Sequence, residues 1–95
     1  MTERKFIQKI IDATEEKFGC LCYAMNNPSG NRPFWNVCID DYDLYRSAEF
    51  KKWNTQWYNE HRASGYSFIM VFCYCHPIAE TLWEYAQNNN LIINV

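Results

Sequence analysis

The stretch Tyr66–Cys75, YSFIMVFCYC, decides the fold, because no charged or amide side chain interrupts it after Ser67. A short apolar run of this kind is typical of a strand that is covered on both faces. We therefore expect it in the centre of a sheet. Its alternate residues form two dissimilar faces. One face consists of aromatic residues and Met: Tyr66, Phe68, Met70, Phe72 and Tyr74. The other consists of small and aliphatic residues: Ser67, Ile69, Val71, Cys73 and Cys75.

The residues before this strand predict one helix and one hairpin. The apolar spacing indicates a helix from the N-cap Thr2 to Phe18, with Gly19 as its stop. Two short segments of β-compatible residues follow, Cys20–Met25 and Phe34–Asp40. The turn-forming residues 26–33, NNPSGNRP, join them. We expect an antiparallel hairpin whose loop projects from the sheet and carries Arg32.

Two further helices and a last strand are predicted around the central strand. Ser47 is suited to cap a helix that ends before Gly65, whereas residues 40–45, DDYDLY, favour a turn. Pro77 is suited to the first turn of a third helix that stops at 88–90, and residues 91–95 close the chain as a strand. The predicted buried stripes are Phe50, Trp53, Trp57 and His61 in the second helix, and Ile78, Ala79, Leu82, Trp83 and Ala86 in the third.

These elements define a single α+β domain over residues 1–95, in the order α-β-β-α-β-α-β, because a chain this short supports one core. The sheet is expected to have four strands and to be mixed, with three helices. The two links that contain a helix should be right-handed crossovers. If the sheet grows in one direction across both links, the second and third helices share a face and the first covers the other.

Composition restricts the classes of partner and the compartment. The formal net charge is −2 and the Lys and Arg residues are scattered, so nucleic acid is not an expected partner. The N-terminal residues lack the pattern of a signal peptide, and the longest apolar run is too short to span a bilayer. Five cysteines, an odd number, predict reduced thiols and a cytoplasmic protein.

Two Cys-x-Cys pairs favour an alternative function, a zinc-binding or redox-regulatory thiol protein. The candidate ligands are Cys20, Cys22, Cys73, Cys75 and His76. Residues two apart in a strand lie about 6.6 Å apart, whereas the sulfurs around a tetrahedral zinc ion lie about 3.8 Å apart. The Cys-x₂-Cys turns that zinc sites favour are absent from the sequence. We therefore expect neither a metal nor another cofactor, and buried reduced thiols instead.

No catalytic motif supports an enzyme, so the first functional hypothesis is a small non-catalytic protein-binding module, an inhibitor or an accessory subunit. It would act through the 26–33 loop and exposed aromatic residues, with a second protein or a second copy of the chain as partner. The predicted binding residues are Arg32, Trp35, Tyr42, Tyr45 and Tyr58. A third hypothesis, binding of single-stranded nucleic acid, requires that the aromatic face of residues 66–75 be open.

Overall fold

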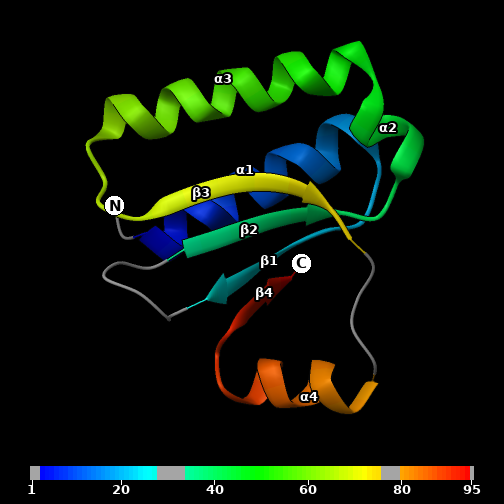
Figure 1. Ribbon diagram of the computed structural model, residues 1–95, viewed down its shortest axis with the longest axis vertical. Helices are drawn as coiled ribbons and strands as arrows, with labels where there is room; N and C mark the ends of the chain where they lie inside the picture. The colour runs from blue at the N-terminus through cyan, green and yellow to red at the C-terminus, as the bar shows by residue number, and fades with distance from the viewer. Residues whose placement is uncertain (1–2, 28–33, 76–79, 95) are drawn as a thin grey trace.

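One mixed sheet organises the protein in the computed structural model, which describes residues 3–27, 34–75 and 80–94 (Figure 1). Its strands are β1 (Cys22–Asn27), β2 (Phe34–Ile39), β3 (Ile69–Tyr74) and β4 (Ile92–Asn94). The helices are α1 (Glu3–Phe18), α2 (Tyr42–Arg46), α3 (Ala48–Ser64) and α4 (Glu80–Asn88). The predicted α+β class, strand number and element order are confirmed, and α2 is an additional short helix.

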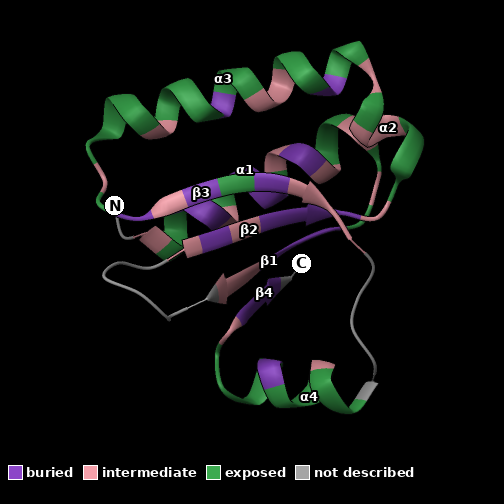
Figure 2. Ribbon diagram, in the orientation of Figure 1, coloured by how far each residue is buried: buried purple, intermediate pink, exposed green. Residues whose placement is uncertain are grey.

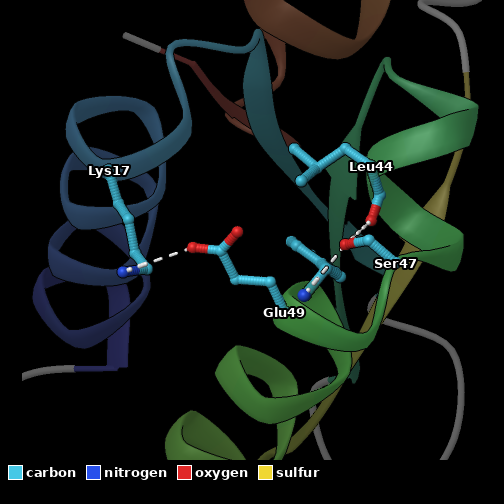
Figure 3. A network of polar contacts seen from close by, with 5 residues as sticks. Lys17, Leu44, Ser47 and Glu49 are labelled. Atoms are coloured by element: carbon cyan, nitrogen blue, oxygen red, sulfur yellow. Dashed lines mark hydrogen bonds and ion pairs between the residues drawn. The ribbon is translucent and has the colours of Figure 1, made fainter.

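Helix α2 lies where the sequence predicted only a turn, because two caps stabilise it. The carboxylate of Asp41 accepts a hydrogen bond from the backbone N–H of Leu44 at 3.0 Å. The hydroxyl of Ser47 donates to the carbonyl of Leu44 at 2.7 Å and accepts from the N–H of Phe50 at 3.1 Å (Figure 3). Ser47 therefore ends α2 and begins α3, as predicted for its role at α3.

Strand β3 is an edge strand, so the predicted central position is wrong. The strand order is β3-β2-β1-β4, with β2 and β3 parallel and the other two pairs antiparallel. The apolar run was misleading because only one face of β3 is fully covered. On its other face the side chain of Val71 is 40% exposed. The central strands are β1 and β2, where Ala24 and Val37 are completely buried.

Helices α1 and α3 share one face of the sheet, and α4 covers the other (Figure 1). The second and third predicted helices were expected to share a face only if the sheet grew in one direction across both links, and this condition is not met. The link from β2 to β3 and the link from β3 to β4 cross the sheet in opposite directions. Crossovers of one hand that run in opposite directions place their helices on opposite faces.

The larger core lies between the sheet and helices α1 and α3, where buried residues of these elements face one another (Figure 2), and it combines aromatic with aliphatic side chains. The ring of Phe6 from α1 packs against those of Trp57 from α3 and Phe68, at centroid distances of 6.1 Å in both cases. On the aromatic face of residues 66–75, Phe68, Met70 and Phe72 are buried. This face is core, so it offers no platform on which bases could stack.

The smaller core lies under α4 and contains Tyr23, Cys38, Ala86 and Ile92. Its helix is only nine residues long and packs over β1 and β4. Ala86 is buried as predicted, but Leu82 is 59% exposed and does not belong to the buried stripe. Ile78 and Ala79 lie outside the described residues. Within the described residues, α4 thus covers this face of β3 only in part.

None of the helices described in residues 3–27, 34–75 and 80–94 is long and apolar enough to cross a membrane.

Candidate functional site

The outer edge of β3 is the first candidate site. In the described part of the chain, β3 pairs with β2 on one side and with no strand on the other. The N–H of Cys75 bonds to the carbonyl of Ile39 in β2 at 3.3 Å. Because backbone direction alternates along a strand, the amides of Met70 and Phe72 point to the outer edge. An open edge of this kind is a template for an added strand.

One hollow lies beside this edge on the side of helix α3, and a second lies between α2 and α3. With the edge they form what we call the β3 groove. The hollow between the helices is the first, lined by Tyr45, Arg46, Phe50, Lys51 and Asn54, and the second is lined by Tyr58, His61, Arg62, Tyr66, Phe68, Ile69 and Met70. The first hollow is connected to the strand through Phe50, whose ring packs on that of Phe72 in the second half of β3 at 5.4 Å. The second hollow lies beside its first half.

One stripe of α3 connects the two hollows. Lys51, Asn54, Tyr58 and Arg62 follow a spacing of three or four residues, so they share one flank of the helix. Helix α3 runs along β3 in Figure 1, which aligns this flank with the strand. Six residues of β3 extend about 20 Å. The β3 groove is therefore long enough for five or six residues of an extended peptide.

The charged side chains that line the two hollows are basic, and no described lining residue is acidic. Arg62 lies over the ring of Tyr58, with 5.8 Å between its guanidinium carbon and the ring centroid. The acidic residues of α3 lie on its opposite flank. Glu49 faces Lys17 of α1 at 3.8 Å (Figure 3), and Glu60 lines a separate hollow with Phe6 and Lys9. The basic residues that line the hollows and the acidic residues of α3 therefore lie on different flanks of the helix.

The structure places only some of the predicted binding residues in or beside the β3 groove. Tyr45 and Tyr58 line its two hollows, and the exposed ring of Tyr42 packs edge-on against Tyr74 of β3 at 5.2 Å. Trp35 was wrongly predicted as a surface contact. It is 0% exposed, because its position on β2 turns it toward the α1 face. Arg32 lies outside the described residues, as does most of the predicted 26–33 loop.

The second candidate site is a group of three cysteines, which we call the thiol cluster. Cys38 of β2 and Cys73 of β3 are register partners, and their sulfurs are 3.4 Å apart. Cys75 follows β3, and the three sulfurs all lie within 4.8 Å of one another. The hydroxyl of Tyr23 donates a hydrogen bond to the Cys75 sulfur at 3.2 Å. The thiol cluster lies on the α4 face of the sheet, away from the hollows of the β3 groove.

The thiols of Cys38 and Cys73 differ in pKa. The hydrogen bond with the Cys38 thiol lowers the pKa of Cys73 to about 7; burial opposes this effect, and the hydrogen bond with the Cys75 thiol adds to it. The pKa of Cys38 is raised, because its proton is held in the hydrogen bond to Cys73 and because the group is buried. Cys73 therefore ionises before Cys38, and its thiolate is stabilised by its neighbours.

The predicted Cys-x-Cys pairs do not meet. Cys22 is buried on the α1 face, where its backbone N–H donates to the Glu15 carboxylate at 2.9 Å and burial raises the pKa of its thiol. Cys20 packs against the same core, and burial raises its pKa as well. His76 lies outside the described residues. Cys38, which the spacing did not predict as a ligand, completes the cluster with Cys73 and Cys75.

No protein-family model matches the chain, and neither a curated protein nor a solved structure is significantly similar to it.

Proposed function

We propose that the protein is a non-catalytic binding module that takes up an extended, acidic segment of another protein as an additional strand beside β3. It would act as an inhibitor or an accessory subunit. The observation that carries the proposal is the β3 groove, in which an open edge of six residues lies beside two hollows with aromatic and basic walls. In this mode of binding, backbone hydrogen bonds supply affinity and the pockets for alternate side chains supply specificity.

The positive charge of the β3 groove favours a different protein, rather than a second copy of the chain, as the binding partner. Arg46, Lys51 and Arg62 would face an added strand, and acidic side chains on that strand would complement them. A second β3 carries no charged residue between positions 69 and 74, and it would bring another basic flank with it. Like charges brought together across an interface oppose association.

The exposed aromatic ring of Tyr58 supports the same proposal. Its side chain is 48% exposed, and its ring holds the guanidinium of Arg62 beside the hollow. Tyr and Arg are the residue types that most often dominate binding energy in protein interfaces. A cytoplasmic location also belongs to this proposal, and the five free cysteines support it, because thiols stay reduced in that compartment.

The test is selection from a displayed library of random ten-residue peptides, followed by affinity measurement with fluorescent copies of the selected peptides. We expect Asp and Glu to alternate with β-branched residues in the selected sequences. Tyr58→Ala and Arg62→Glu should each weaken binding about tenfold or more. Tyr85→Ala is the matched control, because Tyr85 is 63% exposed on α4 and lies outside the groove.

Hydrogen exchange locates the bound peptide. The amides of Met70 and Phe72 should become protected when a selected peptide is added, because they would donate to its carbonyls. Selected peptides that lack acidic residues, or that bind the Tyr58 and Arg62 variants as tightly as the Tyr85 variant, would overturn the proposal. So would protection of both amides without peptide in a dimeric protein, since a second copy would then occupy the edge.

A further inference from the structure

We propose that Cys38, Cys73 and Cys75 bind one thiophilic d¹⁰ cation, and that Zn²⁺ is the natural occupant. This site lies on the α4 face of the sheet, and the inference does not depend on the function proposed for the β3 groove. It rests on the convergence of three sulfur atoms from two neighbouring strands.

The backbone already holds the donors at the required separation. Tetrahedral zinc with Zn–S distances near 2.3 Å needs sulfurs about 3.8 Å apart. The Cys38 and Cys73 sulfurs are 3.4 Å apart, and each sulfur of the cluster is within 4.8 Å of the other two. Small changes in side-chain torsion would therefore bring all three onto one ion. A single regular strand rarely brings two sulfurs this close, and here the pairing of β2 with β3 does so.

The donor set determines which cations would bind. All three donors are thiols, and no carboxylate or imidazole joins the cluster among the described residues. Three sulfur ligands select zinc and softer ions over magnesium or calcium, which prefer oxygen. Cys38 is buried, whereas Cys73 and Cys75 are half-buried. Cys73 and Cys75 are therefore the two ligands nearer to the surface.

Zinc binding would release the protons of the thiol cluster. Coordination would displace them into solvent, because a thiol bound to a metal is deprotonated. No electron transfer is involved. Three thiolates and one divalent cation leave a net charge of −1 at the site.

Tyr23 is the supporting residue of this site. It is fully buried, and its ring packs edge-on against Trp83 of α4 at 5.2 Å. Its hydroxyl donates to both the sulfur and the backbone carbonyl of Cys75, at 3.2 Å in each case. Hydrogen bonds to a ligand atom orient it and tune its donor strength, and their loss typically weakens metal binding about 10- to 100-fold.

The experiment is a zinc titration of the fully reduced chain in competition with a chromophoric chelator, followed by elemental analysis after desalting. We expect one zinc per chain, and a tetrahedral, sulfur-rich spectrum when Co²⁺ replaces it. Cys73→Ser and Cys75→Ser should each weaken zinc binding more than about 100-fold, and Tyr23→Phe about tenfold or more. Cys20→Ser and Cys22→Ser provide matched controls that should keep the site, since both lie outside the cluster.

Cys73 and Cys75 are half-buried, so Cys73→Ser and Cys75→Ser should fold, even if Cys38→Ser does not. The far-ultraviolet dichroism of the two variants should match that of the parent, and a loss of zinc in them then reports on the site. Reduced wild-type chain without stoichiometric zinc would overturn the proposal. Equal loss of zinc in the Cys22 control, or retention of zinc in the Cys73 and Cys75 variants, would do the same. A disulfide between Cys38 and Cys73 that persists in reductant would also overturn it, since it removes two of the three ligands.

Discussion

Replacement of Trp35 by Ala tests whether Trp35 is a core residue or a binding residue. The side chain of Trp35 is 0% exposed in the larger core, and the guanidinium of Arg4 lies 5.4 Å from its ring centroid. Truncation of a buried Trp to Ala costs about 3 to 5 kcal/mol, from lost burial and from the cavity that remains. A domain of 95 residues has a total stability of only about 5 to 14 kcal/mol. We therefore expect Trp35→Ala to remove a large share of it.

The assay is urea denaturation followed by far-ultraviolet circular dichroism, which does not depend on tryptophan emission. Trp35→Phe is the conservative variant. The indole N–H of Trp35 is buried and has no hydrogen-bond partner among residues 3–27, 34–75 and 80–94. Its removal therefore breaks no hydrogen bond with them, and the substitution should cost only about 1.5 kcal/mol or less. The exposed-site variant Tyr85→Ala should stay within about 0.5 kcal/mol of wild type.

The reasoning would be refuted if Trp35→Ala cost less than about 1 kcal/mol, since no fully buried indole is removed so cheaply. If the Ala variant does not fold, Trp35→Phe and Trp35→Leu still give a graded series. In a core site their cost follows the volume removed, whereas at a surface site both costs would be near zero.

Two further predictions concern the α2–α3 junction and the thiol cluster. Ser47→Ala should lower the free energy of unfolding by about 1 kcal/mol, because the Ser47 hydroxyl both caps α3 and bonds to Leu44. Ser64→Ala, in the exposed last turn of α3, should change it by less than about 0.5 kcal/mol. Equal effects of the two substitutions in urea denaturation would contradict this prediction. Because the thiolate is the reactive form of Cys, the alkylation rate of Cys73 should rise with pH, reach half its limiting value at about pH 7 and level off above it. Cys22, whose pKa is raised by burial, should stay unmodified until the protein unfolds. Peptide mass mapping of iodoacetamide-treated protein measures both, and a midpoint near that of an ordinary thiol, about 8.5, would contradict the hydrogen bonding in the cluster.

Features fixed by a few adjacent residues could be predicted from the sequence. Ser47 and Gly65 delimit α3 as expected, because a cap depends on the side chain or the backbone torsion at one position. Gly65 adopts the left-handed conformation, with φ at 72°, that favours glycine. Helix α2 was missed because five residues give no periodicity, and its stability comes from the caps at its two ends.

Features that depend on distant residues could not be predicted in the same way. The alternation within residues 66–75 correctly separates the faces of β3, but it does not reveal which strand or helix covers each face. The position of β3 at the edge follows from the return of the chain to β4 across the whole sheet. The thiol cluster depends likewise on the register that sets Cys38 opposite Cys73, a relation between residues 35 positions apart.

The short strand β4 has a consequence for assembly. Sheets grow into fibres when the free edge of one molecule pairs with the opposite edge of the next, since such head-to-tail contacts do not close. Here that contact would join the six residues of β3 to the three residues of β4. A ladder that short satisfies few backbone groups, so polymerisation is disfavoured although β3 is open.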